Sequence, residues 1–134
     1  MRYLGFLVVA LLLAGFAKPA DATPEWIVYT PEAFAEAQQA GRTILVDVNA
    51  SWCPTCKAQA PILDALRQEP TMSDVTFVKV DFDREEAFLE DHRIPRQSTI
   101  LVFDGETEIA RSVAETDRDR LRAFVLESVS SAAP

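Results

Sequence analysis

Two cysteines at a spacing of three are the side chains best suited to chemistry in this 134-residue chain: Cys53 and Cys56, with Pro54 and Thr55 between them. Cysteines so placed can close a small disulfide with little movement of the backbone. The first follows an apolar strand and stands where a helix should begin, so unpaired backbone N–H groups and the helix dipole favour its thiolate. We therefore predict that Cys53 attacks as the nucleophile and that Cys56, less exposed, resolves the mixed disulfide.

Other uses of the pair stay open at this point. A purely structural bridge would close so short a loop that it would add little stability. A metal-binding or metal-delivery protein would use Cys53, Cys56 and His92, but His92 is the only histidine and a structural zinc site takes four ligands. We therefore assign no metal ligands and no cofactor, and expect His92 to be solvated at the end of a helix. A non-catalytic binding module is the third possibility.

The composition and charge limit the partners and the class of protein that the chain can represent. With 13 Lys and Arg against 21 Asp and Glu, the chain has a net charge of −8, which argues against nucleic acid as a partner. The hydrophobic share of 49% and charged share of 25% are those of an ordinary globular domain. The length allows one domain.

The first residues have the pattern of an export signal. Arg2 precedes a 14-residue apolar run, Tyr3 to Phe16, and small residues follow at Ala20 and Ala22. We predict a signal peptide over residues 1–22, cleaved after Ala22, and a domain over residues 23–134 in an exported, periplasmic protein. The alternative is an uncleaved N-terminal membrane anchor, although the run is short for a span of about 20 residues.

Strands and helices alternate along the predicted domain. The pattern predicts strands at residues 26–29, 43–48, 75–80, 99–103 and 108–113. It predicts helices at residues 30–40, 83–91 and 116–128, and a helical stretch between Cys53 and a polar loop at residues 69–74, with a frayed tail from Ser130. Strands joined through helices pair in parallel, and the late hairpin adds antiparallel strands. The fold class is therefore α/β, with a central mixed sheet of four to five strands and helices on both faces.

The segment from Ile44 to Lys57, with Pro61 five residues after the second cysteine, resembles the active-site segment of the thioredoxin family. The resemblance covers nearly all of residues 23–134 and implies a thioredoxin-like fold. It also implies that Asp47 is a buried carboxylate beneath the cysteines, with Lys79 as its partner on the neighbouring strand. Such a carboxyl group could take the proton from Cys56 as it attacks. A structural Asp47–Lys79 pair without a proton role is the alternative.

One position departs from the family pattern. Thioredoxins have a cis-proline just before the strand at residues 99–103, and the alignment places Ser98 there. A cis bond before a residue other than proline costs about 3–4 kcal/mol, so we expect Gln97–Ser98 to be trans. Ser98 also supplies a backbone N–H and a hydroxyl that proline lacks. We expect changed substrate selection, and some access of metal ions to the thiol pair.

The resemblance also implies a function and partners. We expect a thiol–disulfide oxidoreductase that reduces protein or small-molecule disulfides outside the cytoplasm, as a monomer recharged by a membrane electron-transfer protein. The Pro-Thr dipeptide between the cysteines resembles that of thioredoxin-like proteins of cytochrome c maturation, so this process and envelope redox homeostasis are the candidate settings. The resemblance places substrate contacts at Trp52, Pro54, Thr55, Ser98 and Thr99. Trp52 can be a packing residue at the same time.

Overall fold

The computed structural model of the chain describes residues 22–132, which form five strands, four α-helices and one short 3-10 helix. The strands are β1 (Trp26–Val28), β2 (Thr43–Asn49), β3 (Thr76–Asp81), β4 (Thr99–Asp104) and β5 (Thr107–Val113). The helices are α1 (Pro31–Gln39), α2 (Pro54–Arg67), α3 (Glu86–Asp91) and α4 (Arg118–Ala132), and the 3-10 helix spans Pro70–Met72. The predicted signal peptide and anchor fall on residues outside this part, apart from Ala22, and stay predictions.

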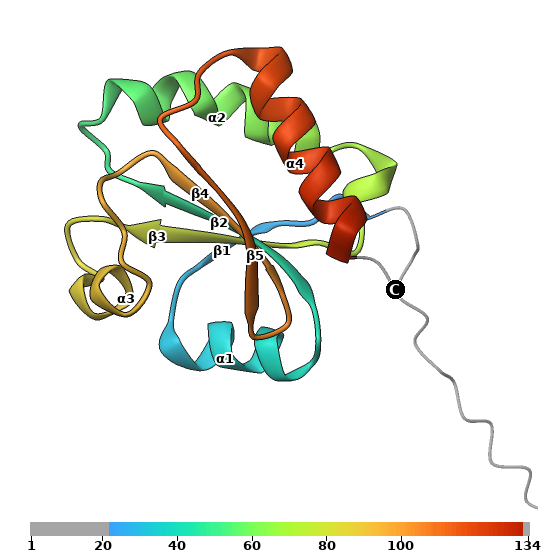
Figure 1. Cartoon of the computed structure of the whole chain (residues 1–134), viewed down its shortest axis with the longest axis horizontal. Helices are drawn as coiled ribbons and strands as arrows, with labels where there is room; N and C mark the ends of the chain where they lie inside the picture. The colour runs from blue at the N-terminus through green and yellow to red at the C-terminus, as the bar shows by residue number, and fades with distance from the viewer. Residues whose placement is uncertain (1–21, 133–134) are drawn as a thin grey trace, which may run out of the picture.

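The strands form one mixed sheet in the order β1-β3-β2-β4-β5. β3 runs parallel to both β1 and β2, whereas β4 is antiparallel to β2 and β5 is antiparallel to β4. α1 and α3 cover one face of the sheet and α2 and α4 cover the other (Figure 1). The predicted α/β fold, with a mixed sheet and helices on both faces, is confirmed with five strands.

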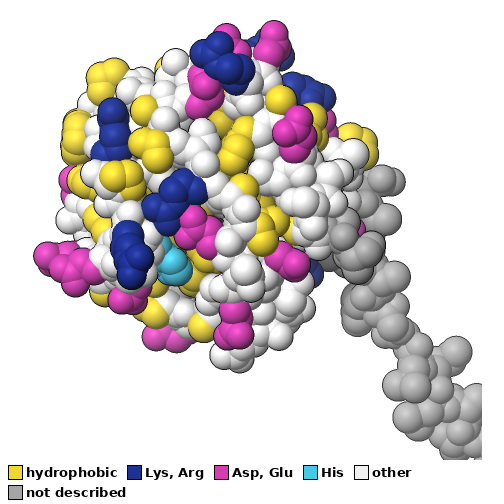
Figure 2. Space-filling view, in the orientation of Figure 1, with side chains coloured by type: hydrophobic (Ala, Val, Ile, Leu, Met, Phe, Trp, Pro, Cys, Tyr) yellow, Lys and Arg dark blue, Asp and Glu magenta, His cyan; other side chains and the backbone are white. Residues whose placement is uncertain are grey.

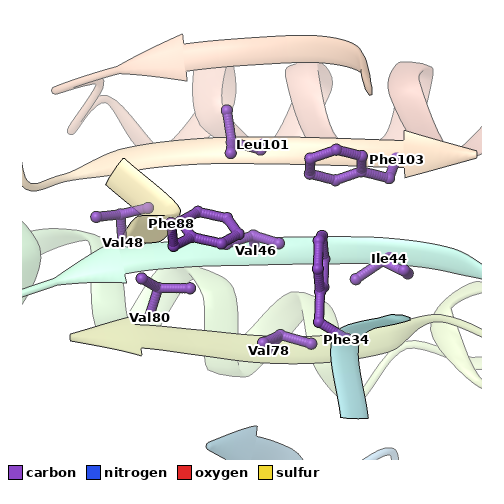
Figure 3. Packing of buried hydrophobic residues seen from close by; sticks show 9 residues of the cluster. All are labelled: Phe34, Ile44, Val46, Val48, Val78, Val80, Phe88, Leu101 and Phe103. Atoms are coloured by element: carbon purple, nitrogen blue, oxygen red, sulfur yellow. The ribbon is translucent and has the colours of Figure 1, made fainter. Parts of the chain in front are cut away.

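The central strand β2 is buried on both faces, as its unbroken run of apolar residues predicts. Alternate side chains point to opposite faces. Ile44, Val46 and Val48 join the core beneath α1 and α3, where Phe34 and Phe88 pack over the sheet (Figure 3).

Leu45 points to the opposite face of the sheet and joins the second core, which α2 and α4 cover. Asp47 lies two residues further along β2 and therefore points to the same side. The alternation of the strand thus directs one carboxyl group into the layer between the sheet and α2.

Local chemistry explains the helix that leads into β2. The Thr30 hydroxyl accepts a hydrogen bond from the backbone N–H of Ala33 at 3.1 Å, and Pro31 occupies the first helical position. The helix ends before Gly41, which has φ of +67°, a conformation that glycine adopts without a steric penalty. These start and stop residues were predicted and are confirmed.

Two predicted boundaries of the last helix are wrong. The residue that caps α4 is Asp117, whose Oδ1 accepts from the backbone N–H of Arg120 at 2.9 Å and whose carbonyl accepts from Leu121, so Thr116 lies outside the helix. At the other end, Ser130 to Ala132 belong to α4, and Ala132 is buried. Burial of the last apolar side chain explains why this end is helical.

The prediction that His92 is solvated is also wrong. His92 lies half-buried at the end of α3, and its ring centroid is 4.2 Å from that of Phe88, 5.9 Å from that of Phe34 and 5.5 Å from that of Phe103. Burial lowers the pKa of His92 below its ordinary value. Figure 2 shows part of this histidine, the only one in the chain, at the surface among acidic and basic side chains.

No helix within residues 22–132 has the length and apolar character needed to cross a membrane.

The cap assignment gives a stability prediction. Asp117→Ala should lower the free energy of unfolding by about 1 kcal/mol, because the N–H of Arg120 loses its acceptor. Thr116→Ala is the matched control and should change stability by less than about 0.5 kcal/mol. Chemical denaturation at neutral pH measures both, and an equal loss in the two variants would contradict the assignment.

Candidate active site

Cys53 and Cys56 form a disulfide at the start of α2, with their Cα atoms 5.3 Å apart. The chain leaves β2 at Asn49 and turns through a hydrogen bond of 3.1 Å from the N–H of Cys53 to the carbonyl of Ala50. Cys53 is the N-cap of α2, and its Sγ accepts from the backbone N–H of Cys56 at 3.1 Å. The predicted position of the pair at a strand-to-helix junction is confirmed.

The exposure of the two cysteines is the reverse of the prediction. Cys53 is fully buried and Cys56 is 7% exposed. Both pack with Ala50, and Phe82 packs against this cluster. Cys56 also lines a pocket of about 150 Å³, which opens between the end of β2 and the first turns of α2.

Asp47 lines the same pocket as Cys56, so the predicted carboxyl group does lie beneath the disulfide. Its side chain is 5% exposed. Oδ2 accepts from Asn49 Nδ2 at 3.3 Å, whereas Oδ1 has no hydrogen-bond partner within residues 22–132. Burial raises the pKa of Asp47 from 3.8 to about 6, and the Asn49 hydrogen bond and the charge of Lys79 oppose this rise.

Lys79 lies directly opposite Asp47 in the parallel register of β2 and β3, as predicted, and lines the same pocket. The two side chains nevertheless form no ion pair within 4.0 Å among the described residues. The Lys79 ammonium instead lies 4.8 Å from the centroid of the Trp26 ring.

The remaining residues around the disulfide are partly at the surface. Trp52 is 54% exposed, and its Nε1 donates to Asp83 Oδ2 at 2.8 Å, so a hydrogen bond at the surface orients this ring. Pro54 is exposed and Thr55 is half-buried. Asp83, in the turn after β3, was not identified from the sequence, because only the fold brings it to Trp52.

Ser98 and Thr99 are fully buried. Gln97–Ser98 is trans as predicted, since residues 22–132 contain no cis peptide bond. Ser98 has φ of +62°, and its N–H donates to the carbonyl of Val48 at 2.7 Å. Its hydroxyl donates to the carbonyl of Gln97, so both donors that distinguish serine from proline are used within the protein.

The comparisons with known proteins decide the family. The family model described as thioredoxin matches residues 25–127. The chain belongs to the thioredoxin family. The thioredoxin of Chlamydia trachomatis is 35% identical over 94 residues, which cover 70% of this chain and 89% of that protein. Thioredoxin C-2 of Corynebacterium nephridii is 36% identical over 96 residues, covering 71% and 87%.

A solved structure agrees with these relatives. The crystal structure of Trxlp from Edwardsiella tarda has a TM-score of 0.72 at 38% identity and covers 75% of this chain and 97% of that one. Thioredoxins exchange disulfides through a Cys-X-X-Cys pair, and Cys53 and Cys56 form such a pair here. The protein is therefore a thiol–disulfide oxidoreductase that acts on protein disulfides.

Gln59 is a buried residue near the active site that was not predicted from the sequence. It is 1% exposed on α2, and its Nε2 donates to the carbonyls of Ser98 at 3.2 Å and Glu115 at 3.0 Å. It thus joins the active-site helix to the Ser98 turn. A signal was available, because Gln59 stands four and seven residues before the core residues Leu63 and Leu66, on the inner face of the helix.

The structure adds no metal ligands to the cysteine pair. Nowhere in residues 22–132 do three His, Cys, Asp or Glu side chains come together as a group able to hold a metal ion. His92 packs in the core beneath α1 and α3, whereas Asp47 points to the opposite face of the sheet.

The buried carboxyl group gives a prediction about pH. Because the unfolded chain binds fewer protons than the folded one between pH 3.8 and about 6, Asp47 should cost stability as pH rises through this window. Above pH 6 the loss in the free energy of unfolding should amount to about 3 kcal/mol. Asp47→Asn should remove it, and urea denaturation of both proteins at pH 4, 5, 6 and 8 measures the difference.

The control is Asp104→Asn, which removes an exposed carboxylate of the same sheet. Asp104 lies at the end of β4 and pairs with Thr43, at the opposite end of β2 from Asn49. This variant should keep the wild-type pH dependence between pH 4 and 6. A difference between wild type and Asp47→Asn that is the same at all four pH values would show that the carboxyl group ionises without cost.

Proposed function

We propose that this thioredoxin acts outside the cytoplasm, mainly as a reductant of disulfides, with Cys53 as its nucleophile. The observation that carries the proposal is the place of Cys53 at the N-cap of α2, where its Sγ already accepts the N–H of Cys56 at 3.1 Å. A hydrogen bond to a thiolate is stronger than one to a neutral sulfur, so this position favours the reactive form.

The reaction begins with both cysteines reduced. The Cys53 thiolate attacks one sulfur of a substrate disulfide, forming a mixed disulfide and releasing the other sulfur as a thiolate, which takes a proton from water. Cys56 then loses its proton and attacks Cys53 Sγ. This step closes the Cys53–Cys56 disulfide and releases the second substrate thiolate. Two electrons pass to the substrate, and the protein ends in the disulfide state of the structure.

Asp47 is the proposed base for the second step. It lines the pocket that also reaches Cys56, and one of its oxygens has no hydrogen-bond partner in the part of the chain that the structure describes. Burial brings the pKa of Asp47 to about 6, so near neutral pH it can accept a proton and release it again. Lys79, which lines the same pocket, supplies positive charge near the carboxylate.

Substrate contacts are proposed on the surface around the disulfide. Trp52 and Pro54 are exposed and Thr55 is half-buried, so they can touch a substrate directly. Ser98 and Thr99 are buried, so their contact with a substrate requires the turn before β4 to move. Cys53 is also covered in the disulfide state and must be uncovered by reduction or by substrate binding.

The location and the partners rest on sequence patterns. Residues 1–22 resemble an export signal, which supports a periplasmic location, with a membrane anchor as the alternative. We also propose that the protein works as a monomer. Disulfides formed there must be reduced again, so we propose a membrane electron-transfer protein as the source of electrons. The Pro54-Thr55 dipeptide supports reduction as the main direction, in cytochrome c maturation or envelope redox homeostasis.

The decisive experiment traps substrates in cells. Cys56→Ala should accumulate mixed disulfides through Cys53, because no thiol remains to resolve them. Cys53→Ala is the matched control and should trap none, and the purified wild type should reduce insulin disulfides. Covalent partners collected from a periplasmic extract are identified by mass spectrometry after release with dithiothreitol.

Two outcomes would contradict the proposal. Trapping by Cys53→Ala in place of Cys56→Ala would reverse the roles of the two cysteines. A stoichiometric metal ion in protein purified under reducing conditions would favour metal delivery. Alkylation of whole cells tests the direction, because a reductant should be found mainly as the dithiol.

The turn before β4 gives a separate prediction about specificity. Ser98→Pro removes the N–H that donates to Val48 and cannot keep φ at +62°, so the turn before β4 must rearrange. We expect the ratio of kcat/KM between two disulfide substrates to change at least about threefold, which corresponds to about 0.7 kcal/mol. Ser98→Ala keeps the N–H and should leave the ratio unchanged; equal ratios in all three proteins would contradict the prediction.

A further inference from the structure

Lys79 and Asp47 are placed to form an ion pair but do not. They are directly opposed across the parallel β2–β3 pair and line one pocket, yet no nitrogen–oxygen contact of 4.0 Å or less joins them. A lysine has four rotatable side-chain bonds, so its reach does not prevent the contact. Some other interaction must hold the ammonium.

That interaction is with Trp26 of the edge strand β1. The Lys79 ammonium lies 4.8 Å from the centroid of the Trp26 ring, within the range of a cation–π contact. Tryptophan is the side chain with the strongest attraction of this kind. A tenfold change in the population of a flexible lysine needs about 1.4 kcal/mol, which lies within the range of such contacts.

The Trp26 ring is itself held on two sides. Its Nε1 donates to Asp64 Oδ1 on α2 at 2.8 Å, and its ring meets that of Phe77 edge to face, with centroids 5.2 Å apart and planes at 80°. Trp26 is half-buried, so the ring has little freedom to turn. A fixed aromatic face therefore stands beside Lys79.

We propose that Trp26 is a positioning residue that holds the Lys79 ammonium away from Asp47 and so leaves the carboxyl group free to take the proton of Cys56. The inference deepens the proposed function, because it rests on Asp47 as the base. An ammonium in contact with the carboxylate would stabilise its charged form and weaken it as a proton acceptor.

The charged groups around Lys79 determine where its ammonium would move if the Trp26 ring were removed. Asp47 faces it from β2, and α2 contributes Asp64 through the Trp26 contact and Lys57 on the rim of the shared pocket. Asp64 also has Arg67 Nε at 3.7 Å. Of these two carboxyl groups, Asp47 is the one with a buried oxygen that lacks a hydrogen-bond partner among the described residues, so a released ammonium would gain most by approaching it.

The test measures the ionisation of Asp47 directly. Wild type and Trp26→Leu, each labelled with carbon-13 in aspartate carboxyl groups, are titrated by NMR in the disulfide state, with Asp47→Asn to assign the signal. In Trp26→Leu the midpoint of Asp47 should fall by about one pH unit or more, as expected for an opposite charge brought within 4–6 Å. An unchanged midpoint would overturn the proposal.

Two further variants separate the lysine from other causes. In the double variant Trp26→Leu with Lys79→Met, the titration midpoint of Asp47 should equal that of Lys79→Met alone. A midpoint that is still lower would mean that water entering the site, and not the ammonium, causes the fall. That result would overturn the proposal. Trp26→Phe keeps an aromatic face if leucine prevents folding, and should lower the midpoint less than leucine does. Repeating the comparison in an Asp64→Asn background removes the competing carboxylate.

These titrations involve no turnover, so they are independent of the trapping experiment. If Cys56→Ala traps no substrate while the Asp47 midpoint moves as expected, the proposed reaction fails and the placement of Lys79 stands. If the midpoint is unchanged while trapping succeeds, the placement fails and the reaction stands. In the second case the pH profile of insulin reduction should also be the same in Trp26→Leu and wild type.

Discussion

The burial of one carboxyl group on the central strand is the constraint on which the active site depends. β2 is paired on both sides and covered on both faces, so nearly every side chain between Thr43 and Asn49 is apolar, and Asp47 is the exception. Burying it raises the pKa of Asp47 to about 6 and disfavours its charge. The surroundings of Asp47 offset this cost of burial only in part. The Asn49 amide donates one hydrogen bond to Oδ2, and Oδ1 has no partner among the described residues. A site shaped for stability alone would have filled this position with another apolar residue, so the incomplete compensation is consistent with a role in proton transfer.

The same strand also determines where the cysteines lie. Because β2 ends at Asn49 and α2 begins at Pro54, the intervening turn places Cys53 at the first unpaired N–H groups of the helix and Cys56 above the pocket that Asp47 lines. One sulfur therefore caps the helix, while the other belongs to a residue that lines the same pocket as the buried carboxyl group. The two thiols of a thioredoxin need different environments, and a strand-to-helix turn provides them within four residues. The parallel register then brings Lys79 opposite Asp47.

Most of the fold and the centre of the site could be predicted from the sequence because they depend on local or periodic signals. The apolar run in β2, the Thr30 cap and the cysteine spacing act over a few residues. The features that were missed depend on contacts between distant segments. Trp26 meets Lys79 only because β1 joins the sheet beside β3, and Gln59 meets Ser98 across 39 positions. Exposure was wrongly predicted for the cysteines, since the packing of Phe82 and Ala50 around them is a tertiary property.

The turn at Ser98 shows how such distant contacts can hold an unfavourable backbone conformation. Ser98 and Ala114 both have positive φ, +62° and +59°, and neither is a glycine, so each carries a steric cost of about 1–2 kcal/mol. They are joined by a hydrogen bond of 3.0 Å from the N–H of Ala114 to the carbonyl of Ser98, which also accepts from Gln59. The N–H of Ser98 is bonded to Val48 on β2. These hydrogen bonds join the turn to three separate segments: β2, α2 and the residue that follows β5. The turn can therefore relax only if several contacts break together. The conformation is thus maintained by β2 and by α2, the same two elements that position the disulfide.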